Sequence, residues 1–232
     1  MPAFPKFPTR SVPPRRWGVY GPANTGKSTF LSALHQPLLV IDPDGRFSEV
    51  AGRCRDPHQI STQPREHRDP LAIHRILSSS DCSQFATVAL DSLTAILEPL
   101  KAAIMEENAR GMHKNKSASW ARKASTLRLI VDSMVGCGLD MALIWHSENG
   151  SDAYGKQQTR QTLTKVEGRR ILRCLNAIIR LEHVNGRRVA HVTWSRNGVQ
   201  GAVIEDTDGY WRGVPERIEQ ALYGESARQA AG

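Results

Sequence analysis

One short stretch constrains the fold of this chain more than any other. Residues 21–28 read Gly-Pro-Ala-Asn-Thr-Gly-Lys-Ser, which fits the pattern G-x-x-x-x-G-K-[ST] of a phosphate-binding loop. Residues 17–20 form an apolar run that can be a strand, and residues 27–35 have the apolar spacing of a helix. The pattern has physical meaning only between a strand and a helix, and it lies between them here. The sequence therefore predicts a strand, a phosphate-binding loop and a helix at this point.

The chemistry of such a loop gives its residues roles. Glycines let backbone N–H groups curl around phosphates, and the start of the helix adds the positive end of its dipole. We expect Lys27 to reach the β- and γ-phosphates and the Ser28 hydroxyl to hold Mg²⁺. The sequence thus predicts a bound nucleoside triphosphate with Mg²⁺ as cofactor. The residues expected to contact it are Gly21, Pro22, Ala23, Asn24, Thr25, Gly26, Lys27, Ser28 and Thr29.

Bulk properties narrow the class of protein. A chain of 232 residues can bury a substantial core as one domain. It has no apolar run of membrane-spanning length, and residues 1–16 lack the apolar core of a signal peptide. The four cysteines form no C-x-x-C pair and are typical of reduced thiols in a cytoplasmic protein. A net charge of +8 favours a polyanionic partner such as nucleic acid, although a solvated basic surface would also explain it.

Short apolar runs alternate with helical stretches, which is typical of an α/β fold with a largely parallel sheet. Strands are expected at residues 17–20, 38–41, 85–90 and 141–145. Helices are expected at 70–79, 92–110 and 119–135, and Pro99 should kink the second or delay its start. The last third favours antiparallel strands at 177–182, 187–194 and 199–204, then a helix at 215–222. We expect a Pro-rich basic arm over 1–16, one domain over 17–223 and a disordered tail over 224–232.

Acidic residues follow two of these strands. Asp91 ends the strand at 85–90, where ligands of parallel α/β sheets bind, so we expect it to order Mg²⁺; its alternative role is to cap the next helix. Asp42 and Asp44 follow the strand at 38–41. One of them could orient or deprotonate an attacking water, or the pair could simply form an Asx-type turn. His146 ends the strand at 141–145 and could sense the γ-phosphate, or it could be an ordinary strand-end histidine.

Basic residues gather further along the chain. Residues 149–165 are polar and predict a mobile loop, and a basic stretch follows at 167–173. The residues expected to contact the phosphates of DNA are Lys156, Arg160, Lys165, Arg169 and Arg170. A solvated basic surface is the alternative. A second basic group surrounds Trp120, which could stack on a base or anchor its helix in the core; it comprises Lys114, Lys116, Arg122 and Lys123.

The blocks GPANTGKST, LLVIDPDG, VALDSLTAI and ALIWHSEN, in that order, resemble the RecA-like recombinase ATPases. Within that group they most resemble small phage ATPases that anneal single strands. The resemblance spans about Trp17 to Ile204. It implies a RecA-like P-loop core with helices on both faces of a mostly parallel sheet and an antiparallel C-terminal extension.

The resemblance also implies site residues. Lys27 and Ser28 match the Walker A lysine and hydroxyl, and Asp91 matches the Walker B aspartate. Asp44 stands where these proteins have the glutamate that activates water, and the shorter side chain puts efficient hydrolysis in doubt. His146 matches the sensor at the end of a strand.

Assembly and DNA binding are implied in the same way. Residues 149–165 match the DNA-binding loop. Arg196 resembles the basic residue that reaches a neighbouring protomer's triphosphate, and a plain hairpin-turn arginine is its alternative. Phe4 and Phe7 could dock on an adjacent subunit. The implied partners are single-stranded DNA, further copies of this chain in a ring or filament with ATP between protomers, and a single-strand-binding protein.

The sequence therefore predicts an ATPase that binds single-stranded DNA and assists homologous recombination by annealing, for a phage or prophage. Two alternatives belong to other classes. A P-loop kinase would need a lid with paired arginines, and residues 149–165 supply only Arg160. A DNA-binding module with ATP as a structural clamp would bind ATP without turning it over.

Overall fold

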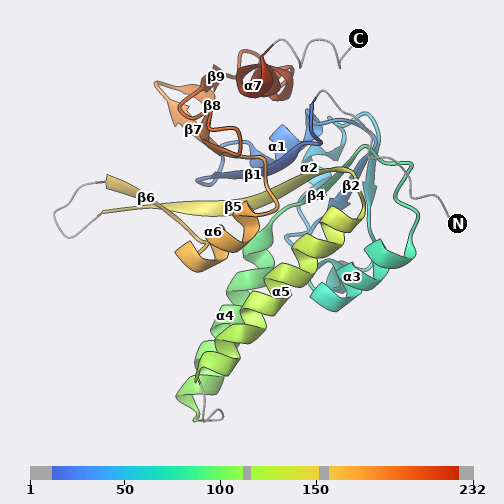
Figure 1. The fold of residues 1–232 in the computed structure, drawn as a ribbon, viewed down its shortest axis with the longest axis vertical. Coiled ribbons are helices and arrows are strands. Elements are labelled where there is room, and N and C mark those ends of the chain that lie inside the picture. The colour runs from blue at the N-terminus through green and yellow to red at the C-terminus, as the bar shows by residue number, and fades with distance from the viewer. Residues whose placement is uncertain (1–11, 112–115, 152–156, 225–232) are drawn as a thin grey trace, which may run out of the picture.

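A nine-stranded sheet forms the centre of the computed structural model across the residues that it describes, 12–111, 116–151 and 157–224 (Figure 1). Its strands are β1 (Arg16–Gly21), β2 (Leu38–Ile41), β3 (Pro57–Gln59), β4 (Thr87–Leu90), β5 (Asp140–Ser151), β6 (Gln157–Gln161), β7 (Ala177–Val184), β8 (Arg187–Ser195) and β9 (Val203–Glu205). The helices are α1 (Lys27–Ser32), α2 (Ser48–Ala51), α3 (Pro70–Ser79), α4 (Leu93–Ala109), α5 (Lys116–Gly136), α6 (Lys165–Leu172) and α7 (Val214–Tyr223), with a 3-10 turn at Pro64–His67.

The strand order is β3-β2-β4-β5-β1-β7-β8-β9, with β6 paired to β5. From β3 to β7 every pairing in this order is parallel, so the carboxyl ends of these strands meet at one edge. The β7–β8 and β8–β9 pairings are antiparallel. This topology confirms the α/β fold, the mostly parallel sheet and the antiparallel C-terminal extension predicted from the sequence.

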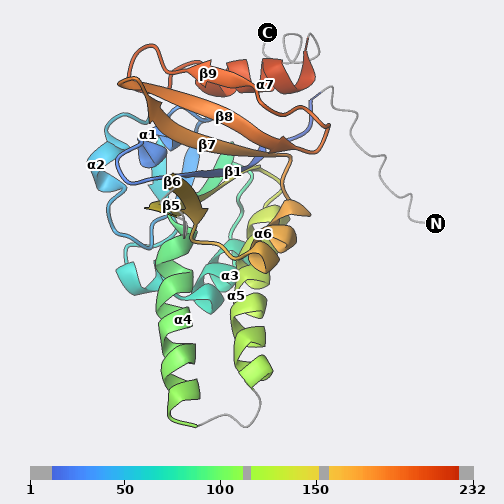
Figure 2. The same ribbon diagram turned by 90° about the vertical axis from the view of Figure 1, so that its left-hand side faces the viewer.

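Helices cover both faces of the sheet (Figures 1 and 2). One apolar cluster joins α1 and α7 to one face through side chains such as Phe30 and Ile218. A second cluster, which includes the buried Trp145 of β5, joins α3, α4 and α5 to the other face. Strands covered on both sides are buried along their whole length, as β2 and β4 are. None of the helices described combines the length and the apolar character that a membrane span needs.

Several expected boundaries were wrong. Helix α4 runs through Pro99 without a late start, because buried residues on both sides of it, Leu97 and Ile104, anchor the helix to the core. Strand β3 and the 3-10 turn lie between β2 and α3, where the sequence analysis expected no strand or helix. Strand β9 begins at Val203 instead of residue 199.

The prediction of a mobile loop at 149–165 was wrong for the residues that the structure describes. The end of β5 and β6 form an antiparallel ladder from the Ser147–Gln161 pair to the Ser151–Gln157 pair, and Figure 1 shows this hairpin reaching away from the body of the sheet. Residues 165–172 form α6. Polar strands without apolar alternation give no strand signal in the sequence, and residues 152–156 lie outside the described part.

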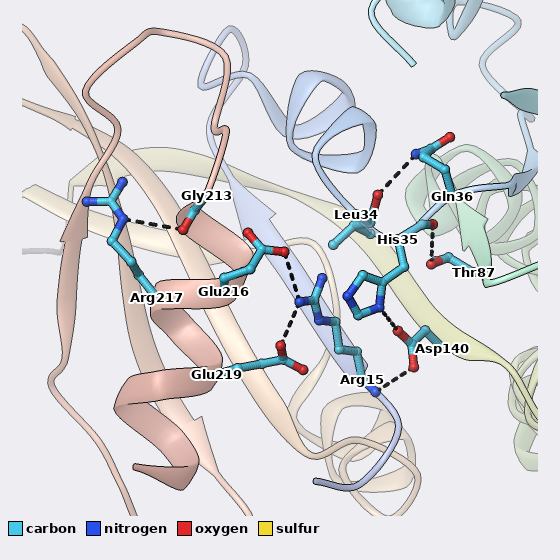
Figure 3. A network of polar contacts seen from close by, with 10 residues as sticks. All are labelled: Arg15, Leu34, His35, Gln36, Thr87, Asp140, Gly213, Glu216, Arg217 and Glu219. Atoms are coloured by element: carbon cyan, nitrogen blue, oxygen red, sulfur yellow. Dashed lines mark hydrogen bonds and ion pairs between the residues drawn. The ribbon is translucent and has the colours of Figure 1, made fainter. Parts of the chain in front are cut away.

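Arg15 fastens the start of the fold to its last helix (Figure 3). Its side chain is 3% exposed, and Nη2 donates to Glu216 and Glu219 of α7 at 3.0 and 2.6 Å. The Arg15 backbone N–H donates to Asp140 at 2.9 Å. Strand β1 accordingly begins at Arg16, one residue before the strand expected at 17–20. Residues 1–11, with Phe4 and Phe7, and the tail at 225–232 lie outside the described residues.

We expect Arg15→Ala to lower the free energy of unfolding by about 1–3 kcal/mol, because it removes hydrogen bonds to charged groups. Chemical denaturation of both proteins measures the change. Arg75→Ala is the control, since Arg75 is 70% exposed and pairs with Glu66 at 3.4 Å; it should change stability by less than about 0.5 kcal/mol. Equal effects of the two substitutions would contradict a special role for Arg15.

Candidate functional site

The predicted phosphate-binding loop connects β1 to α1. Its residues Asn24 and Gly26 have left-handed backbone φ angles of 63° and 80°, and the Thr25 hydroxyl donates to the Pro22 carbonyl at 2.9 Å. Gly21 passes so close to β7 that a Cβ atom would lie 2.2 Å from the Leu181 carbonyl oxygen. The loop therefore has the curled backbone that the pattern predicted.

Lys27 is buried under this loop, with 6% of the residue exposed. Its Nζ donates to the carbonyl oxygens of Gly21 and Pro22 at 3.1 and 2.7 Å. Burial lowers the pKa of the Lys27 ammonium below its usual value, and the charges of Asp91 and Asp44 oppose that shift. An anionic ligand in front of the loop would offer this ammonium a stronger partner than neutral carbonyls do.

Asp91 follows β4 and is 7% exposed. The nearby Ser28 hydroxyl favours the ionised form of the Asp91 carboxylate. Burial is the main reason that the pKa of Asp91 rises to about 6, and the nearby Asp44 and Asp42 raise it further. The Ser28 hydroxyl and the Lys27 charge lower this pKa. A buried carboxylate beside a hydroxyl fits the oxygen ligands that Mg²⁺ prefers.

The alternative role of Asp91 as a helix cap does not match the structure, because Ser92 occupies the N-cap position of α4. The Ser92 hydroxyl instead donates to the Asp44 carboxylate at 2.9 Å. Asp44 is exposed and lines the same cavity as Asp91. The residue after Asp91 thus helps to orient Asp44.

The geometry separates the two acidic residues that the sequence left open. The Asp42 carboxylate accepts backbone N–H groups of Gly45, Arg46 and Phe47 at 2.9, 3.2 and 2.8 Å. It therefore holds the turn after β2, as an Asx-type turn does. Asp44 has its carboxylate free of such backbone bonds in the described residues. Asp44 is consequently the better placed of the two to face a water molecule.

His146 lies beside the loop, because β5 pairs with β1 so that His146 is the register partner of Gly21. Burial and then the Lys27 charge lower the pKa of His146 below its usual value, although Asp44 raises it. Burial and the Lys27 charge thus favour the neutral imidazole. The His146 backbone N–H donates to the Thr94 hydroxyl at 3.0 Å, and its carbonyl accepts from the Thr162 hydroxyl at 2.9 Å.

A cavity of about 570 Å³ opens over these groups. Most of the predicted site residues line it, namely Ala23, Asn24, Gly26, Lys27, Ser28, Thr29, Asp44, Asp91 and His146. Gly21, Pro22 and Thr25 do not line it. Sequence reasoning missed Arg188 of β8, which also lines the cavity and donates to the Gly209 carbonyl at 2.5 Å. No local signal marks it, since only the strand order brings β8 to this edge.

None of the predicted DNA-binding side chains that the structure describes lines the cavity. Lys165, Arg169 and Arg170 are exposed on α6. Lys156 lies outside the described residues, as does the side chain of Arg160 in β6. A buried ion pair of 2.7 Å between Lys123 and Glu167 ties α6 to α5.

The second basic group is not a free cationic surface where it is described. Lys123 forms an ion pair with Glu167, and Arg122 forms one with Glu107 at 3.2 Å. Trp120 is 42% exposed and does not anchor α5 in the core. Lys114 and the side chain of Lys116 lie outside the described part.

Arg196 lies at the opposite edge of the sheet from the phosphate-binding loop, just beyond the Ser195–Ala177 pair where β7 begins. Its guanidinium donates to the carbonyl oxygens of Arg173 and Leu175 at 2.6 and 3.2 Å. It therefore does not contact the cavity of its own chain. Its predicted action on a neighbouring protomer stays a prediction.

The fold and the site together define an α/β protein with a P-loop. A family model described as "AAA domain" matches residues 14–199, and the chain belongs to this family. This match confirms the AAA-type domain expected from the sequence. No curated protein sequence matches the chain.

Two solved structures are similar in fold at low identity. The RadB recombinase has 19% sequence identity and a TM-score of 0.49, with 84% of this chain and 87% of that chain covered. A KaiC-like protein from the hyperthermophilic archaeon Pyrococcus horikoshii has 10% identity and a TM-score of 0.48, with 87% and 88% covered.

The pKa of Asp91 predicts a pH-dependent effect of Asp91→Asn. The pKa of Asp91 is about 6 in the folded state, whereas its usual value is 3.8, so the folded protein binds this proton more tightly. This stabilisation is complete below pH 3.8 and is lost as the pH rises through about 6. Asparagine cannot ionise. Without Mg²⁺ and nucleotide, the variant should therefore be more stable than the wild type above pH 7, by at most about 3 kcal/mol, and the difference should vanish near pH 4.

Thermal unfolding of both proteins between pH 4 and 8 measures this difference. Asp81→Asn is the control, because backbone and side-chain hydrogen bonds from Ser83 lower the pKa of the exposed Asp81. Its substitution should have the opposite sign above pH 4. A constant difference between wild type and Asp91→Asn across this range would contradict the raised pKa.

Proposed function

We propose that this protein hydrolyses ATP with Mg²⁺, binds single-stranded DNA and assists homologous recombination, by annealing strands for a phage or prophage. One observation carries the proposal: Lys27, Asp91 and His146 meet at one cavity, and the backbone of His146 is bonded to the segment that leads to the basic helix α6. Family membership supports the ATPase part. The basic surface supports the part that concerns DNA.

Each side chain has a task in this proposal. Lys27 binds the β- and γ-phosphates, and Ser28 and Asp91 hold Mg²⁺, which neutralises charge on the phosphates when it is bound. Asp44 orients a water molecule towards the γ-phosphorus and takes its proton. The bond between that phosphorus and the β,γ-bridging oxygen breaks, and the products are ADP and phosphate. The Ser92 hydroxyl keeps the Asp44 carboxylate directed towards the cavity.

Coupling between ATP and DNA would run through His146. Its imidazole lines the cavity, while its carbonyl accepts from Thr162, which follows β6. The Thr162 and Thr94 hydroxyls also contact each other at 3.0 Å. A shift of His146 on loss of the γ-phosphate would therefore reach the β5–β6 hairpin and α6 through hydrogen bonds. Such a shift would reset the affinity for DNA.

Assembly would place ATP between protomers of a ring or filament. Arg196 is exposed at the sheet edge opposite the cavity, so head-to-tail contact would bring it to the cavity of the next protomer. To reach a γ-phosphate, Arg196 must give up a carbonyl partner. This exchange is favourable because a hydrogen bond to a charged phosphate is stronger than one to a neutral carbonyl. A single-strand-binding protein could deliver the DNA, and cytoplasmic localisation fits the reduced thiols.

Steady-state ATP hydrolysis with and without single-stranded DNA tests this function. DNA should stimulate turnover, and Lys27→Ala should abolish it because the phosphates lose their ammonium partner. Sedimentation in the presence of ATP should reveal oligomers. Normal turnover by Lys27→Ala would overturn the site. Turnover that is indifferent to DNA would favour a kinase, and tight ATP binding without turnover would favour a clamp.

The basic helix α6 has its own test. We expect the double variant Lys165→Ala, Arg169→Ala to bind single-stranded DNA more weakly at low salt. The slope of log affinity against log salt concentration should fall by about 0.7 for each phosphate contact removed. Fluorescence anisotropy at salt concentrations from about 50 to about 200 mM measures both the affinity and its salt slope. Arg75→Ala, on α3, removes a charge elsewhere, and an equal change in that variant would contradict a local interface.

A further inference from the structure

Trp211 lies behind the phosphate-binding loop, far from it in the sequence. It is fully buried and follows β9 in the turn formed by residues 206–211. Its indole Nε1 donates to the Gly26 carbonyl oxygen at 3.0 Å. Its ring meets Phe30 of α1 edge to face, with 5.7 Å between the ring centroids. Trp211 lies beyond residues 14–199, the part that matches the family.

The bond from Trp211 acts on a peptide unit of the loop. The Gly26 carbonyl also accepts the Phe30 backbone N–H at 2.8 Å, so two donors fix its direction. Because a trans peptide unit is planar, its N–H points opposite to its carbonyl. The Lys27 backbone N–H therefore points away from Trp211, towards the cavity lined by Lys27 and Ser28. Backbone N–H groups at this place in a P-loop are the ones that cradle phosphates.

The chain accepts strain to hold Trp211 there. Its backbone φ is 64°, a left-handed value that is an outlier for a bulky side chain. The Asp206 carboxylate stabilises the turn by accepting the backbone N–H groups of Trp211 and Gly209, both at 3.0 Å. Arg188 holds the Gly209 carbonyl from the side of the cavity. Strain of this kind persists only where the surroundings enforce it, and it concentrates at functional sites.

Close approach makes the contact specific. A Cβ atom on Gly26 would lie 2.9 Å from the Trp211 indole nitrogen and 3.2 Å from Arg188 Nη1. The second glycine of the loop pattern thus meets two requirements in this chain, a left-handed φ and room for the indole. The turn at 206–211 and the loop are therefore built to fit each other.

We propose that Trp211 is a positioning residue for nucleoside di- and triphosphates. Its indole N–H fixes the Gly26 carbonyl, and this directs the Lys27 backbone N–H at a phosphate. The proposal rests on nucleotide binding at the loop, which belongs to the proposed function. It adds that a residue of the C-terminal turn sets the affinity of the loop for phosphate.

Trp211→Phe tests the proposal, since it keeps an aromatic ring against Phe30 and removes the N–H. The matched control is Trp17→Phe, because Trp17 is also buried and packs on Phe30, at 6.4 Å between centroids, but is not bonded to the loop. Titration with a fluorescent ATP analogue should show about five- to tenfold weaker binding for Trp211→Phe, the effect of one lost hydrogen bond. Trp17→Phe should bind within about twofold of wild type even where its melting temperature falls.

A second measurement uses the wild-type protein and does not depend on the folding of a variant. The indole N–H resonance of Trp211 in a proton–nitrogen spectrum should shift when ADP is added, and that of Trp17 should not. A Trp211 resonance that does not move, or a Trp211→Phe variant that binds the ATP analogue like wild type, overturns the role of Trp211 alone. Failure of the wild type to bind the analogue at all overturns the proposed function as well.

Discussion

Parallel pairing of β1, β5 and β4 is the constraint on which the rest of the structure depends. It sets Gly21 beside His146 and places the end of β4, where Asp91 follows, at the same edge. Segments far apart in the sequence thereby share one cavity. The helices on both faces bury the strands, so a slip of the register would disrupt the packing of apolar side chains on both faces. A functional geometry thus follows from the packing of the core.

Among the residues that the structure describes, Lys27, Asp91 and Asp44 in the cavity form no ion pair. The Lys27 ammonium donates to neutral carbonyl oxygens. Ionising Asp91 costs free energy because the carboxyl is buried. Asp44 adds a further negative charge nearby. Each of these groups gains a stronger partner from a phosphate or a divalent cation than it has in the free protein. The free energy gained from these stronger partners would add to the affinity for a phosphate or a cation. It also gives a reason why Lys27 and Asp91 are buried.

Local signals made part of this structure predictable. The loop pattern placed Lys27 and Ser28, and the helix expected at 70–79 is confirmed, with Asp69 as its cap and Pro70 in its first turn. The β5–β6 hairpin was missed, because its polar strands lack alternation and are recognised only by their pairing. Asp42 and Asp44 could not be separated, since that depends on which carboxylate meets backbone N–H groups. Arg188 and Trp211 reach the loop through the fold alone.

The bond between Trp211 and Gly26 joins residues that are 185 positions apart. A chain that is still being synthesised presents the loop and its lysine early, yet it lacks the indole until the turn after β9 has emerged from the ribosome. The same holds for the anchoring of Arg15 by α7. If Trp211 has the role proposed above, a nascent chain would retain a nucleotide firmly only after the turn that follows β9 has been made.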